Sequence, residues 1–252
     1  MSFGVPAGAY DRFMGRYSVM LSPQLCDLAG VRSGLRVLDV GCGPGALTAE
    51  LVARVGPESV AAVDPSETFV AAAHERQPDV DVRRASAEEL PFEDVSFDAA
   101  LAQLVVQFMG DPVAGVAEMR RVTRPDGVVA ACVWDHGTGH GPLSPFWRAV
   151  HELVPDAADE SKAVGTSPGE LSEVFRDAGL RDVEETMLTV SVEHPSFEEW
   201  WDPFTLGVGP AGAYVAKLSV DGRTRVRDRL REQLSDGPFV LTARAWAARG
   251  VV

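Results

Sequence analysis

The chain has 252 residues, of which 46% are hydrophobic, enough for one large α/β domain with an ample core. Acidic residues outnumber basic ones by 37 to 23, for a formal net charge of -14. Because proteins that grip a nucleic-acid backbone present a basic face, this balance argues against a nucleic-acid partner.

Hydropathy and cysteine content indicate the compartment. No apolar stretch approaches the ~20 residues of a membrane span, and residues 1–8 lack the basic start and apolar core of a signal peptide. Cys26, Cys42 and Cys132 are odd in number, widely spaced and outside any metal-binding pattern. We expect buried free thiols, no metal site and a cytoplasmic protein.

The first elements are an N-terminal helical segment, within residues 1–30, and a strand that enters a glycine-rich turn. Residues 35–40 form an apolar run typical of a strand buried on both faces of a parallel sheet. Gly41, Gly43 and Gly45 follow, and then an apolar-periodic helix. This is the first half of a βαβ unit whose turn lets a nucleotide approach the backbone, although a merely tight turn is the alternative.

The cofactor held by this turn depends on one acid. Gly41, Gly43 and Ala46 satisfy the G-x-G-x-x-G/A pattern, so a dinucleotide is open. A carboxylate at Asp39 would repel a pyrophosphate but attract a sulfonium and an ammonium group. If Asp39 points at the ligand, S-adenosylmethionine is the cofactor that fits.

The second strand, residues 59–63, ends at Asp64 and is followed by a helix that begins near Ser66. An acid about 20 residues beyond the glycines can accept hydrogen bonds from both ribose hydroxyls. Asp64 is therefore predicted to bind the cofactor, with a helix N-cap as its alternative role. Phe69 is placed to flank the adenine, although core packing is the other expectation.

The first half of the chain resembles a known family. VLDVGCGPG, at residues 37–45, resembles the first motif of class I S-adenosylmethionine-dependent methyltransferases, with a specific Asp-x-Gly-x-Gly-x-Gly core. Phe97 and Asp98 match the family's Phe-Asp pair, and residues 119–134 resemble its turn into the fifth strand. The chain is similar to the small-molecule enzymes of ubiquinone and menaquinone biosynthesis, and it lacks the Asn-Pro-Pro-Tyr run of amino-group methyltransferases of DNA and some proteins.

The resemblance implies a Rossmann-like α/β fold, a doubly wound seven-stranded sheet that is mostly parallel with an antiparallel last strand. It implies that the N-terminal segment folds over the cofactor, with Tyr10 near the ligand and Arg16 binding the methionine carboxylate.

The resemblance also implies cofactor contacts after the third strand, residues 80–85, and at the end of the fourth, residues 99–106. Ser86 stands where the family has an Asp that binds the adenine amino group, but its hydroxyl can still accept a hydrogen bond. The backbone N–H of Ala87 is unaffected by this exchange. Gln103 falls beside the cofactor, with an ordinary polar strand end as the alternative.

Two histidines follow the fifth strand, residues 128–134, in a glycine-rich loop on the ligand face. An ordinary pKa of about 6.5 suits His136 or His140 to take a proton from a hydroxyl acceptor. One of them is predicted to be a general base, with a merely polar loop as the alternative.

The second half predicts a sixth strand at residues 183–192 and a last strand at residues 238–247, separated by a helical insertion at residues 194–237. The aromatic cluster of this insertion forms either its core or a pocket for an apolar or aromatic acceptor: Trp200, Trp201 and Phe204. We expect a single domain, residues 1–252, with an N-terminal lid at 1–30, a cofactor-binding core at 31–135, and the insertion over the substrate.

The predicted function is in-line transfer of a methyl group from S-adenosylmethionine to a small molecule, leaving S-adenosylhomocysteine. Such a reaction needs mainly proximity, alignment and exclusion of water. An NAD(P)-dependent oxidoreductase and a cofactor-binding protein without turnover are the alternatives.

Overall fold

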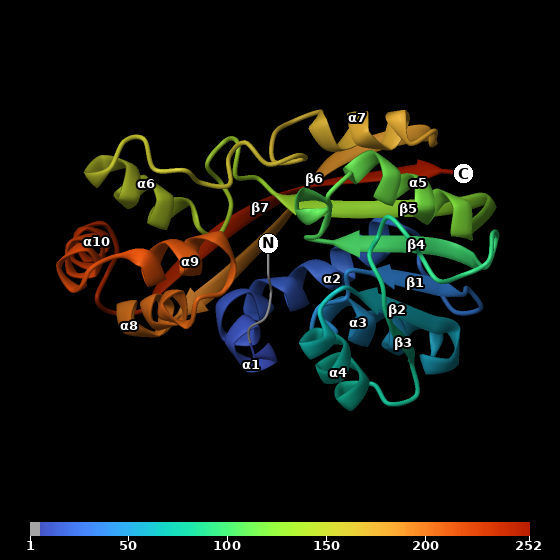
Figure 1. Ribbon diagram of the computed structural model, residues 1–252, viewed down its shortest axis with the longest axis horizontal. Coiled ribbons are helices and arrows are strands. Elements are labelled where there is room, and N and C mark those ends of the chain that lie inside the picture. The colour runs from blue at the N-terminus through green and yellow to red at the C-terminus, as the bar shows by residue number, and fades with distance from the viewer. Residues whose placement is uncertain (1–5) are drawn as a thin grey trace.

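Seven strands form one sheet in the order β3-β2-β1-β4-β5-β7-β6 in the computed structural model, which describes residues 6–252 (Figure 1). Strands β1 to β5 pair in parallel, whereas β7 runs antiparallel to both β5 and β6. The predicted fold, mostly parallel with an antiparallel last strand, is confirmed. The strands are β1 (Val37–Val40), β2 (Val60–Asp64), β3 (Asp81–Arg84), β4 (Phe97–Gln103), β5 (Thr123–Trp134), β6 (Arg181–His194) and β7 (Phe239–Val251).

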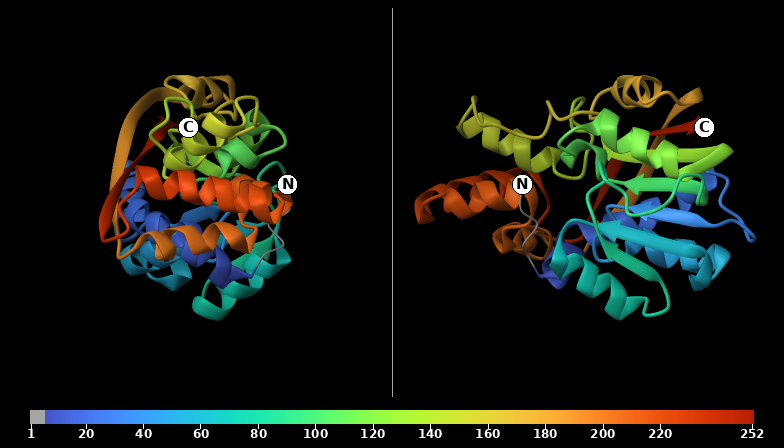
Figure 2. Two further views of the ribbon diagram at one scale, coloured as in Figure 1. Left: turned by 90° about the vertical axis from the view of Figure 1, so that its left-hand side faces the viewer. Right: turned by 45° about the vertical axis from the view of Figure 1, so that its right-hand side comes forward.

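Helices cover both faces of the sheet (Figures 1 and 2). Side chains of β1 alternate between the two faces, so Val37 packs into one core while Leu38 and Val40 pack into the other. Burial on both sides explains the continuous apolar run in the sequence. One face carries α2 (Arg16–Leu28), α3 (Ala46–Val55) and α4 (Glu67–Arg76), and the other carries α5 (Pro112–Val122) and α7 (Glu170–Asp177).

The entry to β5 differs from the predicted turn. The strand begins at Thr123, opposite Phe97, and the pairing with β4 shifts before it resumes at Val128. Asp126, within the shifted stretch, has a left-handed φ of 61°. The predicted turn before the strand is therefore an irregularity within β5.

The N-terminal segment is one continuous helical run built of α1 (Ala7–Tyr10), a π-helical turn (Asp11–Gly15) and α2. Figure 1 shows it beneath the ends of the strands, next to α4. The first five residues of the predicted lid lie outside the described part of the chain. The lid role itself stays a prediction.

Four helical segments lie between β6 and β7, beyond the ends of the parallel strands, and Figure 2 shows them facing α6 (Ser144–Leu153). Trp200, Trp201 and Phe204 are buried against one another, which is the core role rather than the pocket role. Arg229 pairs with Glu152 and so joins the last of these helices to α6. The segments are α8 (Phe197–Trp201), a 3₁₀ turn (Asp202–Leu206), α9 (Gly209–Lys217) and α10 (Val220–Gln233).

Two predictions about side chains and spans can be compared with the structure. Cys26, Cys42 and Cys132 are all free and buried, as expected. Across residues 6–252, no helix combines the length and the apolar character needed to cross a membrane.

Candidate functional site

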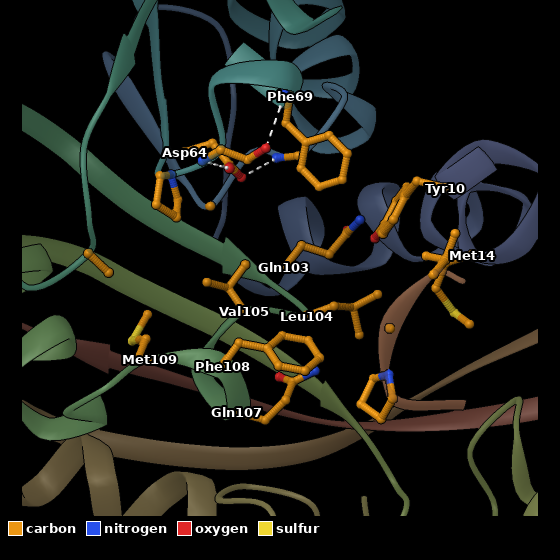
Figure 3. Close-up of a pocket in the computed structure, with 18 of the residues that line it drawn as sticks. Tyr10, Met14, Asp64, Phe69, Gln103, Leu104, Val105, Gln107, Phe108 and Met109 are labelled. Atoms are coloured by element: carbon orange, nitrogen blue, oxygen red, sulfur yellow. Dashed lines mark hydrogen bonds between the residues drawn. The ribbon is translucent and has the colours of Figure 1, made fainter. Parts of the chain in front are cut away.

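A cavity of about 530 Å³ opens where the parallel strands end (Figure 3). Each of β1 to β5 contributes residues at or just after its carboxyl end, which is where doubly wound sheets bind ligands. The N-terminal helical run and the start of α9 complete the wall. Of the predicted site residues, the lining includes Tyr10, Gly41, Gly43, Asp64, Phe69, Ser86, Ala87, Gln103 and His136.

The glycine turn presents open backbone to the cavity. Gly43 has a φ of 53°, and a Cβ added there would meet no atom within 4 Å. The amide groups of the turn are already used: Gly41 and Cys42 donate to the carbonyl of Val63, and Gly43 donates to Asp64. A pyrophosphate bound in a glycine-rich turn needs such N–H groups. The turn therefore suits a ligand that approaches glycine closely without an anionic group at that point.

Asp64, at the end of β2, is held rigidly at the cavity wall (Figure 3). One carboxylate oxygen accepts from the Gly43 N–H at 2.9 Å and the other from the Ser66 N–H at 2.8 Å. Burial raises the pKa of Asp64, and the two backbone donors oppose that rise. Ser66, rather than Asp64, caps helix α4. Because each carboxylate oxygen has a second lone pair, Asp64 can still accept hydrogen bonds from a ligand.

Asp39 does not face the cavity. Its side chain is fully buried below the glycine turn, and one carboxylate oxygen accepts a 2.6 Å hydrogen bond from the Thr48 hydroxyl in the first turn of α3. The other oxygen has no partner among the described residues. Burial raises the pKa of Asp39 to about 7. The assumption that this acid points at the ligand fails, because alternation in β1 turns its side chain toward α3.

The aromatic side chains of the N-terminal run and α4 meet at one end of the cavity. The rings of Tyr10 and Phe69 form an edge-to-face pair with centroids 5.6 Å apart (Figure 3). Phe13 and Met14, from the π-helical turn, line the same wall. Arg16 points elsewhere, because its guanidinium pairs with the Glu199 carboxylate at 2.7 Å.

His194 connects this ion pair to the core. His194 Nδ1 lies 3.0 Å from the Arg16 guanidinium and 3.3 Å from the Glu199 carboxylate, and Nε2 lies 2.9 Å from the Tyr17 hydroxyl. Arg16 thus links α2 to α8 and does not line the cavity.

A hydrogen bond to the N-terminal helical run fixes the orientation of the Gln103 amide at the end of β4. Its Nε2 donates to the Ser18 carbonyl at 3.1 Å, and its buried Oε1 has no partner among the described residues. Gln107 Oε1 and Trp134 Nε1, two further buried atoms of cavity-lining residues, also lack described partners. These atoms are polar positions that a ligand can satisfy.

The segment after β4 contributes apolar wall that the sequence analysis missed. Leu104 has a φ of 62°, which is costly for a residue with a branched side chain and is common at functional sites. Val105, Phe108 and Met109 extend the wall (Figure 3). In the sequence, these apolar residues follow a predicted strand end. That pattern is as typical of core packing as of a cavity wall, so it did not identify them as site residues.

The two loop histidines differ in position. His136 is buried and lines the cavity, and burial lowers its pKa to about 4. His140 is half exposed, bonds to Thr138 at 2.9 Å and does not line the cavity. A conjugate acid with a pKa near 4 makes His136 a weak base near neutral pH.

Glu160 is an ionisable cavity residue that sequence reasoning missed. It lies in the polar loop between α6 and α7, and its Oε2 accepts a 2.9 Å hydrogen bond from the indole N–H of Trp147. Burial raises its pKa to about 7. The sequence offered no local signal, because the loop is simply acidic and polar.

Comparisons with known proteins agree with this arrangement. Residues 38–131 match the family described as "Methyltransferase domain". The chain is 35% identical over 158 residues to the demethylmenaquinone methyltransferase of Mycobacterium sp. (strain KMS), covering 63% of each chain. It is 30% identical over 181 residues to the "Probable S-adenosylmethionine-dependent methyltransferase" of Mycolicibacterium smegmatis, covering 68% of each.

The matches differ in extent. The chain spans 47%, 57% and 63% of the length of the first three relatives. Among solved structures, the YcgJ protein of Bacillus subtilis superposes with a TM-score of 0.58 at 19% identity, covering 93% of this chain and 97% of that one. At this identity, the superposition supports the fold alone.

Proposed function

The chain belongs to the S-adenosylmethionine-dependent methyltransferase family, and we propose that it transfers the cofactor's methyl group to a small, largely apolar molecule. The proposal rests on the glycine turn. The space beside Gly43 is open, and the amide groups of the turn already donate hydrogen bonds to the Val63 carbonyl and the Asp64 carboxylate. Among the described residues, the N–H groups of Gly41, Cys42 and Gly43 already have acceptors, which disfavours a pyrophosphate at this turn and hence the dinucleotide alternative.

The cavity residues fit the cofactor. Asp64 would hold the ribose hydroxyls, and Phe69 would flank the adenine, whose edge would meet Ser86 and the backbone N–H of Ala87. Gly43 leaves room for the chain that joins ribose to sulfur, whereas Gly41 packs directly against Val105. Asp64, Glu67 and Glu88 line the cavity near the ends of β2 and β3, and these acids would suit a ligand with cationic groups.

The protein's part in the reaction is to hold two molecules in line and keep water away. When bound, S-adenosylmethionine supplies a methyl group already activated by a sulfonium. The apolar side chains of Leu104, Phe108 and Trp134 line the cavity near the ends of β4 and β5, and they exclude water there. Holding the reactants in place can contribute ~7–11 kcal/mol to lowering the barrier.

The same wall supports the class of acceptor. Among the cavity-lining residues that the structure describes, Arg84 is the sole Lys or Arg, and it lies at the end of β3. An anionic acceptor or a nucleic-acid backbone would find no partner near β5. We therefore propose an uncharged, apolar acceptor, with the protein in the cytoplasm where its three buried thiols stay reduced.

Calorimetry and label transfer test the proposal. S-adenosylhomocysteine is expected to bind and NAD is not, and tritium from methyl-labelled S-adenosylmethionine is expected to enter apolar metabolites of a deproteinised cell extract. Binding of NAD in place of S-adenosylhomocysteine would contradict the assignment. Tight S-adenosylhomocysteine binding with no label transferred would instead indicate a cofactor-binding protein without turnover.

Asp64→Ala is expected to weaken S-adenosylhomocysteine binding by ~10–100-fold, because hydrogen bonds to a charged group contribute roughly 1.5–3 kcal/mol. Asp64→Asn should lose less, since one acceptor oxygen remains. Calorimetric titration of both variants measures the effect, with circular dichroism as the check of folding. Wild-type affinity in both variants would leave Asp64 with the sole role of bracing the Gly43 and Ser66 amides.

A further inference from the structure

Glu160 and the cofactor-facing residues lie on opposite sides of β4. Gly43 and Asp64 follow β1 and β2, whereas Trp134 and His136 belong to the end of β5 and the loop after it. The loop of Glu160 is tied to the His136 loop by a 2.9 Å hydrogen bond from the Gly137 N–H to the Thr166 carbonyl. The carboxyl group of Glu160 thus belongs to the acceptor side of the cavity.

One oxygen of this carboxyl group is fixed and the other is available. Trp147 donates its indole N–H to Oε2 at 2.9 Å, whereas Oε1 has no hydrogen-bond partner among residues 6–252. Glu160 lines the same cavity as Gln103 and Gln107, whose buried Oε1 atoms also lack partners among the described residues. Three hydrogen-bond acceptors in one apolar chamber call for a ligand that brings donors of its own.

We propose that Glu160 is the catalytic base of this cavity and that the acceptor is an apolar ring bearing a hydroxyl group, held with its O–H toward Oε1. This inference rests on the proposed function. A neutral amine can take a methyl group without a base in the cavity and lose its proton afterwards. A hydroxyl must lose its proton as the new bond forms, and so it requires a base within reach.

The proton balance favours a carboxylate here. The hydroxyl oxygen of the acceptor would bond the methyl carbon with one of its lone pairs, its proton would pass to Glu160 Oε1, and the electron pair of the broken carbon–sulfur bond would stay on sulfur. A sulfonium, a carboxylate and a neutral hydroxyl become a thioether, a carboxylic acid and a methyl ether. Opposite charges disappear together, which an apolar chamber tolerates better than the creation of new charge.

Glu160 is also better matched to this task than His136. A pKa raised to about 7 makes Glu160 a stronger base than His136, whose pKa is lowered to about 4. Three titratable groups surround the site: Asp159 beside Glu160 on the same loop, His136 on the neighbouring loop, and His151 of α6, 3.6 Å from Asp159.

A spectroscopic titration tests Glu160 without turnover. The indole N–H resonance of Trp147, identified by its loss in Trp147→Phe, is expected to shift with pH around a midpoint near 7. In Glu160→Gln the amide oxygen can still accept the hydrogen bond from the Trp147 indole. The pH-dependent shift of the resonance should disappear, because glutamine does not ionise. Glu173→Gln, the same exchange on the surface of α7, should leave the titration unchanged.

Binding of a matched pair of probes tests the acceptor class. With S-adenosylhomocysteine saturating and at pH 8, 2-naphthol is expected to bind about tenfold more tightly than its methyl ether, 2-methoxynaphthalene. Glu160→Gln should abolish that preference, because Trp147 holds the amide oxygen and turns the NH₂ group toward the acceptor hydroxyl. Equal binding of the two probes, binding of neither, or a preference that survives in Glu160→Gln would overturn the proposal.

The cofactor control separates this inference from its premise. S-adenosylhomocysteine should bind wild type and Glu160→Gln equally, since Glu160 lies on the acceptor side. If S-adenosylhomocysteine binds neither protein, the proposed function fails. If it binds both proteins, but probe binding and the indole titration are the same in wild type and Glu160→Gln, the methyltransferase assignment stands and the role of Glu160 as base is wrong.

Discussion

Gly43→Val is expected to lower the affinity for S-adenosylhomocysteine by ~100-fold or more in a folded protein. The Cβ at this position meets no protein atom within 4 Å and projects from a turn that lines the cavity. Valine methyl groups would therefore occupy ligand space beside a backbone that three hydrogen bonds to β2 and Asp64 hold in place. Overpacking a rigid site costs up to about 3 kcal/mol, which sets the size of the loss.

A matched variant separates occlusion from strain. Gly43 has a left-handed φ, so any branched residue there also costs roughly 1–2 kcal/mol of stability. Gly30, just after the C-cap of α2, has a φ of 66° and equally open space but does not line the cavity. Gly30→Val should lose similar stability in urea and keep its affinity in calorimetry. Unchanged affinity in folded Gly43→Val would remove the cofactor from this turn.

Asp39→Asn is expected to gain stability relative to wild type as pH rises. In the folded protein the pKa of Asp39 is raised to about 7 by burial, whereas in the unfolded chain it is near the ordinary 3.8. Between these values the folded state holds a proton that the unfolded state has released, so the wild type loses stability as pH increases. Asparagine has no proton to lose, and the difference should grow by roughly 2 to 3 kcal/mol from pH 5 to pH 8.

Urea unfolding of both proteins at several pH values measures this slope. The NH₂ group of asparagine would lie where one carboxylate oxygen lacks a partner, and this changes stability by an amount that does not depend on pH. The difference in unfolding free energy between the two proteins at pH 5 measures that amount and is subtracted from the differences at higher pH. Asp156→Asn, in the exposed part of the loop after α6, controls for the removal of a surface charge. A stability difference that stays constant with pH would show that Asp39 remains ionised in the folded state.

The first half of the fold could be predicted because its signals are local. The apolar run of β1, the glycines after it and the acid that ends β2 each depend on neighbours within a few residues. Strand ends on a parallel sheet converge, so the positions of Asp64 and Gln103 at the cavity followed from the elements alone.

The directions of other side chains depended on distant partners. Arg16 turns from the cavity because its partner, Glu199, lies 183 residues away in the chain. Glu160 lies at the cavity because its carboxylate accepts a hydrogen bond from Trp147 of α6, and because its loop is hydrogen-bonded to the loop after β5. No periodicity or spacing carries that information, because these contacts exist only once the second half of the chain has folded onto the first.

The π-helical turn at Asp11–Gly15 has a consequence for how this wall of the cavity can vary among relatives. A π turn holds one residue more than an α turn of the same height. Deleting a single residue there would restore regular α geometry and keep Ala7–Tyr10 in its register relative to α2. Tyr10 would stay beside Phe69, whereas Phe13 and Met14, the cavity-lining residues of the turn itself, would be repositioned. The shape of this wall is thus encoded in chain length as well as in residue identity, and an alignment gap here changes the site as a substitution does elsewhere.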